Sequence, residues 1–254
     1  MVKDATKPSR GRRPREVADM TRASILSSAE QLFSKRGYYG VAVRDVAREA
    51  GVDSALVHYH FGSKDDLFSA ALLSRAEGFM EERRTALDIC LKESNNQPSI
   101  EAVIRAYTRP YLEHAATGDP GWRAWFRLLA TASLSIDWAP SVWKDHFNPF
   151  VKEFIDALKL AAPEAPEGHY YWCYHFFSGA LVMTFADTGR MDSLSDGQCK
   201  SDDLAAGYDL LVPFFSLAFG EILSGKSGPL LPIDPFRKLA SEDQQNITSK
   251  PSKS

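Results

Sequence analysis

The chain has 254 residues, of which 44% are hydrophobic and 25% are charged. These values are ordinary for a folded globular protein, and they exclude a histone-like polycation and an acidic disordered protein as descriptions of the whole chain. The charge is unevenly distributed, because residues 1–64 hold 12 Lys and Arg against 7 Asp and Glu, whereas the remaining residues hold 18 against 26. A short basic segment joined to a larger acidic one is typical of a nucleic-acid-binding head on a non-binding body.

Residues 1–17 are expected to form a disordered basic arm. The segment is polar and contains Pro8, Gly11 and Pro14, so it cannot bury a hydrophobic core by itself. Its basic residues are Lys3, Lys7, Arg10, Arg12, Arg13 and Arg15. Arms of this kind can enter the minor groove of DNA.

An apolar stripe predicts a first helix that runs from about Thr21 to Arg36. Its members recur with the period of an α-helix, and Gly37 directly after two basic residues is a typical helix stop. The stripe consists of Ile25, Leu26, Ala29, Leu32 and Phe33. Two short helices are predicted next, over residues 44–50 and 54–60, with three residues between them.

The two short helices have the features of a helix-turn-helix. Ala47 is small where the helices must cross, and Gly51 permits a tight turn between them. Asp53 or Ser54 can cap the second helix. The apolar positions of the small core are Val46, Val52 and Val57. Such a pair lets the second helix enter the major groove of DNA, although many helical hairpins share the pattern.

The rest of the chain is also predicted to be helical. Ser63 and Asp66 resemble a capping box at the start of a long amphipathic helix that runs towards Cys90. The later helices are predicted over residues 99–116, 119–136, 140–162, 167–188 and 202–223, with a loop over 189–200. No alternation with the period of a β-strand stands out, so the predicted fold class is all-α.

These elements predict two domains, a helix-turn-helix domain over residues 18–66 and a helical body over residues 67–224. Residues 225–254 are rich in Pro, Ser, Gly and Asn, and a largely disordered tail is expected there. The uncharged run from Tyr170 to Ala186 is shorter than a bilayer span and contains polar side chains, so a core or interface helix is expected. The basic and polar start lacks the apolar segment of a secretion signal, which favours a cytoplasmic location.

The sequence around the predicted helix-turn-helix resembles the DNA-binding domain of the TetR/AcrR family of bacterial repressors. The resemblance covers about residues 20–72. The segments that carry it are Phe33 with Gly37-Tyr38, VRDVA at 43–47, AGV at 50–52 and YHFGSKDDL at 59–67. It implies a repressor that binds a palindromic operator on double-stranded DNA as a homodimer and is released by a small-molecule effector. The chain departs from the family at two positions, because Ala42 and His58 stand where the family often has Thr and Tyr.

The second short helix is expected to lie in the major groove. Its early turns carry Ser54, Ala55, Leu56 and His58, which are candidates to reach the edges of the bases. Ser and His can form hydrogen bonds with bases, whereas Ala and Leu can only contact thymine methyl groups. Part of the specificity is therefore expected to come from DNA shape.

Four further residues are candidates for contacts with phosphates. Tyr59, His60 and Lys64 resemble positions that contact phosphate in the family, and Lys64 also lies at a helix N-terminus. Arg44, at the start of the preceding helix, is the fourth. The alternative roles are core packing for Tyr59, a structural hydrogen bond for His60 and a solvated charge for Lys64 and Arg44.

In the resembling family, the C-terminal helices bind the effector and form the homodimer. Here the dimer would form through residues 167–188 and 202–223, which are rich in Phe, Tyr and Leu. The aromatic density of the body suits an apolar cavity, although the same residues could be ordinary core. The candidate ligand-binding residues are Phe79, Tyr107, Trp125 and Trp172, with Arg109 and His175 as polar groups. The closing pattern is similar to regulators of fatty-acid metabolism, which favours a fatty acyl or aromatic ligand.

No feature of the sequence indicates an enzyme, a metal site or a cofactor. The motifs GxGxxG, GxxxxGKS/T, GxSxG and HExxH are missing, and the six histidines lack the spacing of metal ligands. The three cysteines form no CxxC pair. They leave one alternative open, in which the same DNA-binding head carries a redox-sensing or protein-partner-sensing body that uses Cys90, Cys173 or Cys199.

Overall fold

A computed structural model describes residues 12–117, 119–134 and 142–225, and every regular element within these ranges is a helix. The all-α prediction is therefore confirmed. The helices are α1 (Arg12–Arg36), α2 (Val43–Ala50), α3 (Ser54–Phe61), α4 (Lys64–Leu73), α5 (Ala76–Glu93), α6 (Ile100–Ala116), α7 (Pro120–Ser133), the π-helix η1 (Trp143–Phe147), α9 (Asn148–Ala161), α10 (Glu167–Phe185), α11 (Arg190–Leu194) and α12 (Leu204–Leu223).

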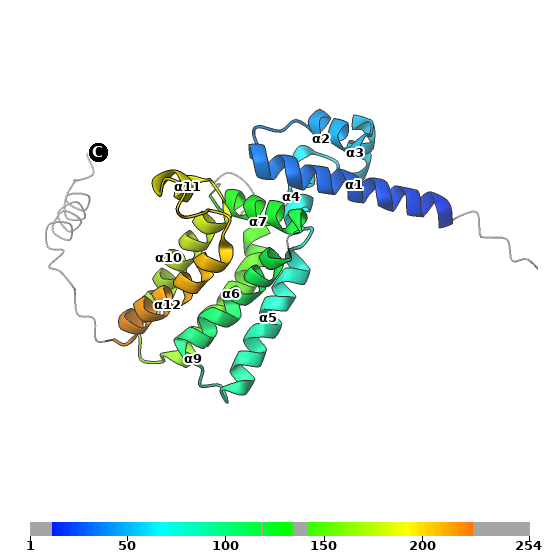
Figure 1. Ribbon diagram of the computed structural model, residues 1–254. Coiled ribbons are helices and arrows are strands. Elements are labelled where there is room, and N and C mark those ends of the chain that lie inside the picture. The colour runs from blue at the N-terminus through cyan, green and yellow to red at the C-terminus, as the bar shows by residue number, and fades with distance from the viewer. Residues whose placement is uncertain (1–11, 118, 135–141, 226–254) are drawn as a thin grey trace, which may run out of the picture.

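Helices α1 to α4 form a small head at one end of the molecule, and the remaining helices form the body (Figure 1). The predicted apolar stripe of α1 faces the core of the head, where Ile25, Ala29 and Phe33 are fully buried. Val46 from α2 and Val57 from α3 are buried against it. Packing on this one long helix holds the two short helices in place.

The turns of the head follow local rules. Gly51 ends α2 in the left-handed conformation, with a φ of 67°, and the N–H of Val52 donates to the carbonyl of Ala47 at 2.9 Å. Of the two candidate caps of α3, Asp53 fills the role, because its carboxylate accepts from the N–H of Ala55 at 2.7 Å. These caps set the angle at which α3 leaves α2.

The predicted capping box at the start of α4 is confirmed. The Ser63 hydroxyl accepts from the N–H of Asp66 at 3.1 Å, and the Asp66 carboxylate accepts from the N–H of Ser63 at 2.9 Å. These hydrogen bonds lower the pKa of Asp66 below its ordinary value. The charged carboxylate therefore supports the turn between α3 and α4.

The prediction of a disordered arm up to residue 17 was wrong for residues 12–17, which belong to α1. Pro14 does not prevent this, because it stands in the first turn, where backbone N–H groups have no partner within the helix. Residues 1–11 of the arm and residues 226–254 of the predicted tail lie outside the described residues.

The prediction of one long helix from Ser63 towards Cys90 was also wrong, because a turn at Ser74 and Arg75 divides it into α4 and α5. The Ser74 hydroxyl donates to the carbonyl of Ala71 at 2.8 Å. The Arg75 guanidinium lies 5.0 Å from the centre of a Trp122 ring in α7. Contacts made by distant residues thus outweigh the helical period, which continues through the turn.

The body is a layered helical bundle around an aromatic core (Figure 1). Helix α6 packs between α5 and α12, and α10 packs against α7, α9 and α12. Helix α10 ends at Phe185 rather than at the predicted Thr188, and the predicted loop over 189–200 contains the short helix α11. The other predicted body helices differ from the observed ones by a few residues at their ends.

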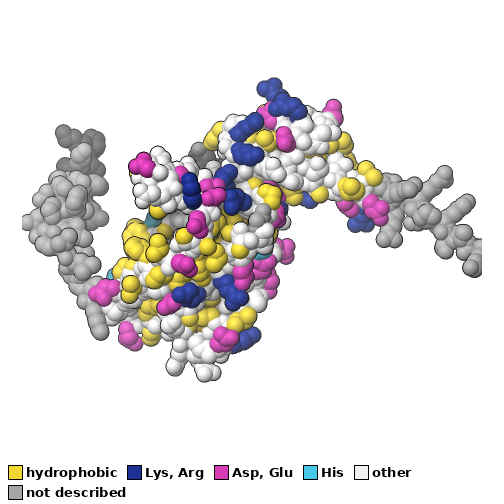
Figure 2. All heavy atoms as spheres, in the orientation of Figure 1, with side chains coloured by type: hydrophobic (Ala, Val, Ile, Leu, Met, Phe, Trp, Pro, Cys, Tyr) yellow, Lys and Arg dark blue, Asp and Glu magenta, His cyan; other side chains and the backbone are white. Residues whose placement is uncertain are grey.

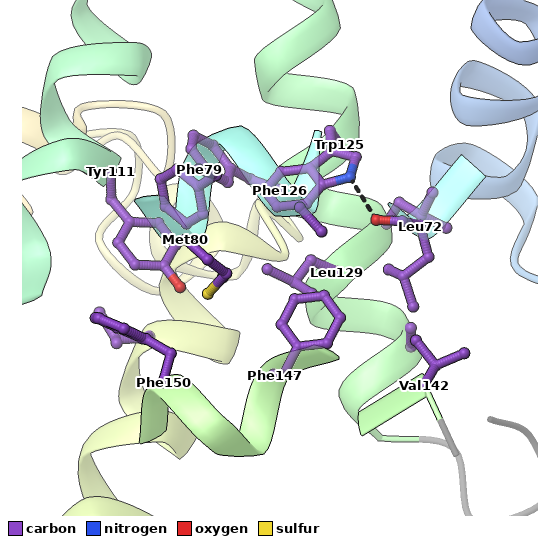
Figure 3. Packing of buried hydrophobic residues seen from close by; sticks show 14 of the residues in the cluster. Leu72, Phe79, Met80, Tyr111, Trp125, Phe126, Leu129, Val142, Phe147 and Phe150 are labelled. Carbon is purple, nitrogen blue, oxygen red and sulfur yellow. Dashed lines mark hydrogen bonds between the residues drawn. The ribbon is translucent and has the colours of Figure 1, made fainter. Parts of the chain in front are cut away.

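Head and body meet where α7 passes beneath α1 (Figure 1). The indole N–H of Trp125 donates to the carbonyl of Leu72 at 2.9 Å, and both side chains are fully buried (Figure 3). Leu72 belongs to the last turn of α4, where carbonyls have no partner within the helix. The side chain of a body helix thus satisfies a buried acceptor of the head.

Replacing Trp125 with Phe is expected to lower the free energy of unfolding by about 1–3 kcal/mol, because the Leu72 carbonyl loses its donor. Urea unfolding followed by far-UV circular dichroism, at one fixed protein concentration, measures this change. Trp143→Phe is the control, since its half-buried indole forms no hydrogen bond with the described residues. Equal losses in the two variants would contradict the assigned role of the hydrogen bond.

Candidate nucleic-acid interface and effector cavity

Helix α3 presents one face to the core and the other to solvent. Val57 and Phe61 are buried against the head, whereas Ala55, Leu56 and His58 are exposed. Tyr59 is 81% exposed, so the alternative role of core packing is excluded for this side chain. Ser54 is half-buried at the start of the helix. The candidate base-contacting residues therefore lie on or beside one accessible surface, apart from their helix's buried side.

The ring of His58 is held by the turn between α3 and α4. Its Nδ1 lies 2.8 Å from the carbonyl oxygen of Gly62. A carbonyl oxygen only accepts, so Nδ1 carries a proton, and the neutral ring leaves Nε2 as an acceptor. Gly62 has a φ of +79°, and a Cβ there would lie 2.9 Å from a carboxylate oxygen of Asp66. The turn needs glycine, and glycine in turn sets the orientation of the His58 ring.

Lys64 occupies the first position of α4, as predicted, but it is not freely solvated. Its Nζ lies 4.1 Å from the centre of the Tyr38 ring, and the Tyr38 hydroxyl donates to Asp65. That hydrogen bond raises the pKa of Tyr38 to about 12. A cation over the face of a ring is attracted by its quadrupole, so Tyr38 positions the Lys64 ammonium at the N-terminus of α4.

The other candidate phosphate contacts lie close by in the chain. His60 is half-buried, and its ring packs edge-on against the ring of Tyr59, with 5.2 Å between their centres. Arg44 is exposed in the first turn of α2. Lys and Arg side chains also appear on the outer surface of the head in Figure 2. The head thus combines exposed cations with an accessible helix, which is the pattern of a DNA-binding surface.

Ala42, where the resembling family often has Thr, makes no side-chain contact that caps α2. Its backbone N–H instead donates to the Asp45 carboxylate at 3.0 Å. This hydrogen bond is the main reason why the pKa of Asp45 is lowered. The helix start is therefore stabilised without the hydroxyl that could have contacted a phosphate.

A cavity of about 100 Å³ lies inside the body, between α5, α6, α7, η1, α9 and α10. Most of its walls are aromatic or aliphatic side chains. In Figure 3 the hydroxyl of Tyr111 and the sulfur of Met80 point towards one another, with Phe147 and Leu129 on the opposite side. The shape and apolar lining are those of a small-molecule site.

The sequence analysis missed Arg83, the one cation among the described residues that line this cavity. Its side chain is only 2% exposed, and its Nη2 has no hydrogen-bond partner among the described residues. The signal was present in the helical period, since Ala76, Phe79 and Leu87 lie on the same buried face of α5. Position 83 falls on that face although it carries a charge.

The structure does not bring the six predicted ligand-binding residues together. Tyr107 lines the cavity, whereas Phe79 and Trp125 are buried in the adjoining core, with 5.4 Å between their ring centres. Arg109, on the surface of α6, pairs with Glu113 at 2.6 Å. The remaining two residues, Trp172 and His175, lie on the outward face of α10. Residue type indicated aromatic character, but it could not indicate which side of each helix faces inwards.

Helices α10 and α12 share an exposed apolar face, which is prominent in Figure 2. We call it the α10–α12 face, and its large side chains are Trp172, Phe176, Met183, Leu210, Phe214 and Leu217. Trp172 is 60% exposed and Leu217 is 77% exposed. Helix α12 is also long and apolar enough to cross a membrane, by length and composition only. Large exposed apolar areas of this kind mark surfaces that contact a partner.

The cysteines offer little support for a redox site. Burial raises the pKa of Cys90 and raises the pKa of Cys173 to about 11, so both thiols stay protonated at neutral pH. Cys199 is exposed, and all three cysteines are free. Within the described part of the chain, no group of three or more His, Cys, Asp and Glu side chains is arranged to hold a metal ion.

Comparisons with known proteins agree on both parts of the chain. Residues 25–71 match the family model described as bacterial regulatory proteins of the tetR family. Residues 105–216 match the model described as the tetracyclin repressor-like C-terminal domain. Together the two matches cover more than half of the chain, and they correspond to the head and to the body.

Curated relatives are transcriptional regulators. The chain is 41% identical over 105 residues to the HTH-type transcriptional regulator ArpR of Pseudomonas putida, a match that covers 39% of this chain and 50% of ArpR. It is 34% identical over 67 residues to the regulator HbdR of Aromatoleum sp. (strain CIB), covering 26% of this chain and 29% of HbdR. The chain thus spans half or less of the length of these relatives.

Solved structures share the fold. A TetR-family transcription regulator from Shewanella sp. PV-4 is 20% identical with a TM-score of 0.50, covering 76% of this chain and 97% of that one. The TetR-family regulator PfmR from Thermus thermophilus is 19% identical with a TM-score of 0.51, covering 74% and 97%. At this level of identity the likeness concerns the arrangement of the helices.

Proposed function

The chain belongs to the TetR family of bacterial transcriptional regulators, and from this premise we propose that it is a repressor that binds a palindromic operator as a homodimer and leaves it when a small effector binds. The observation that carries the proposal is the accessible face of α3, capped at both ends and flanked by cations, on a head joined to a body with an internal cavity. The protein would act in the bacterial cytoplasm, where its DNA target lies.

Base recognition is assigned to the exposed side of α3. Ser54 can donate to or accept from a base, while Ala55 and Leu56 can contact thymine methyl groups. The Nε2 atom of His58 is left as an acceptor by the hydrogen bond to Gly62, so it suits the amino group of adenine or cytosine in the major groove. His58 is then the most discriminating of the four side chains.

Phosphate contacts are assigned to the residues around the turn from α3 to α4. Tyr59 is highly exposed, Lys64 is positioned by Tyr38, and both lie beside the N-terminus of α4. Backbone N–H groups at a helix N-terminus also favour a phosphate. Arg44 and His60 complete the set. Contacts of this kind place the head on the duplex without reading its sequence.

The α10–α12 face is assigned to the homodimer. Two copies would bury their exposed apolar side chains against each other, which suits an obligate, hydrophobic interface. The same role accounts for the apolar composition of α12 without a membrane. A two-fold interface of this type would place two α3 helices at a defined separation, to match successive major grooves about 34–36 Å apart.

Effector control is assigned to the helices that line the cavity and also hold the head. Helix α5 follows the head directly at the turn that contains Arg75, and α7 both lines the cavity and packs against α1. An effector that favours one arrangement of these helices would shift the population towards heads that are wrongly spaced for the operator. In-vitro selection from random duplex DNA tests the proposal, and a palindromic motif is expected.

The assigned role of Lys64 predicts a smaller salt dependence of DNA binding. In Lys64→Gln, the plot of log K against log salt should lose about 0.9 per phosphate contact, and hence about 2 for a dimer. Fluorescence anisotropy with duplex DNA at several salt concentrations measures the slope. Lys152→Gln is the control, since Lys152 is an exposed cation of the body. Equal slopes for the two variants would remove Lys64 from the phosphate-binding set.

The assigned role of His58 predicts a change in sequence preference. In His58→Ala, discrimination at one base pair of each half-site should fall by about 1–3 kcal/mol, with little change in binding to unrelated DNA. Selection and sequencing with both proteins measures this, and His146→Ala, exposed in η1, is the control. An unchanged motif for His58→Ala would mean that other residues read the bases.

The assigned role of the α10–α12 face predicts that one charge there separates the subunits. Leu217→Glu should sediment as a monomer at micromolar concentration, because two carboxylates would be buried at the interface. Analytical ultracentrifugation reports the mass, and circular dichroism reports the helix content. Ile89→Glu, an exposed apolar position on α5, should remain dimeric. A dimeric Leu217→Glu would place the interface elsewhere.

A further inference from the structure

Arg83 is a buried cation without a carboxylate partner in the described chain. Its neighbour Arg84 pairs with Glu81 at 2.8 Å and with Glu153 at 2.9 Å. Arg105 and Arg109 likewise pair with acidic side chains on the same helix. No such pair is formed by Arg83 within residues 12–117, 119–134 and 142–225. A buried charge is strongly disfavoured unless it is paired, so this arrangement points to an external counter-ion.

Aromatic rings hold the Arg83 guanidinium in place but leave part of it unsatisfied. The Cζ atom lies 3.6 Å from the centre of the Tyr107 ring, 4.5 Å from that of Phe150 and 4.8 Å from that of Tyr111. Nε donates to the carbonyl of Tyr107 at 3.3 Å. These contacts stabilise the cation and fix its plane. They leave Nη2 buried, without a hydrogen-bond partner among the described residues.

The rest of the cavity offers hydrogen-bond donors and no competing anion. Tyr111 and Tyr174 line it, and burial raises the pKa of each above its ordinary value, so their hydroxyls stay protonated and can donate. Asn148 and Ser178 also line it, whereas no Asp or Glu is present among the described lining residues. One cation with neutral donors and apolar walls is complementary to an organic anion.

We infer that Arg83 binds the carboxylate of the effector, and that the effector is a small carboxylate with a single ring or a short acyl chain. The planar guanidinium suits a carboxylate because its N–H groups match the two oxygens. A cavity of about 100 Å³ limits the apolar part to roughly the size of one ring. The inference rests on the proposed effector control, and it replaces the exposed Arg109 and His175 as the groups that hold the ligand.

The test compares acids with their neutral amides on the full-length protein. Benzoate, phenylacetate and hexanoate are titrated by calorimetry beside benzamide, phenylacetamide and hexanamide, which have similar shape and no charge. At least one acid is expected to bind ten-fold or more tightly than its amide. In Arg83→Met that acid should lose ten-fold or more in affinity, while its amide changes less than three-fold. Arg109→Met, which removes an exposed guanidinium, should behave as the natural protein.

A folding control accompanies the titrations. Arg83→Met should unfold at the same temperature as the natural protein or at a higher one, because an apolar side chain replaces an unpaired buried charge. A lower unfolding temperature, together with equal binding of acid and amide to the natural protein, would show that Arg83 serves only to pack the aromatic rings. Arg83→Lys keeps the charge and should retain part of the preference for the acid.

Two results would overturn the inference, and neither depends on DNA. One is that no acid binds the natural protein more tightly than its amide, and the other is that Arg83→Met retains full affinity for the acid. Operator binding is measured separately, with and without the acid. If the acid binds through Arg83 but does not release DNA, the anion site stands and the proposed effector control fails.

Discussion

The hydrogen bond from Trp125 to the carbonyl of Leu72 is the interaction on which the arrangement of head and body depends. A helix end buried in a protein interior has carbonyls that water cannot reach, and each of them requires a donor. The break between α4 and α5 creates such an end at the centre of the molecule. Beside it, the Arg75 Nε lies 3.5 Å from a carboxylate oxygen of Glu30 in α1, while its guanidinium covers Trp122 in α7. The head is therefore attached to the body by satisfied polar groups as well as by apolar packing.

This attachment gives the body a physical route to the head. Helix α7 contributes Trp125 to the junction and Leu129 to the cavity, which are one helical turn apart. Helix α5 starts at the junction and carries Arg83 two turns later. A ligand that moves either helix must disturb the packing around Leu72, because close-packed interiors transmit small displacements. Cavity and DNA-binding surface are then coupled through a few shared side chains, without a separate transmitting element.

The DNA-binding surface was predictable because its determinants are local. Glycine at 51, an acidic cap at 53 and the pair formed by Ser63 and Asp66 act within a few residues of chain, so their consequences follow from sequence spacing. Even there, the contact between His58 and Gly62 was not foreseen, although the two residues are separated by only one helical turn. The cavity was less predictable, because aromatic side chains such as Trp172 and Tyr107 have similar composition but opposite exposure. Exposure is set by the packing of several helices at once.

The sequence by itself determined the all-α class, the boundaries of the short helices and the surface that α3 presents, because helical period and capping are short-range effects. Only the tertiary structure decided where the long helix breaks, which side of α10 is exposed and which cation lies inside the body. Arg83 illustrates the reason. Its charge argues for the surface, and only the rings of Tyr107, Tyr111 and Phe150, brought from two other helices, make a buried position tolerable.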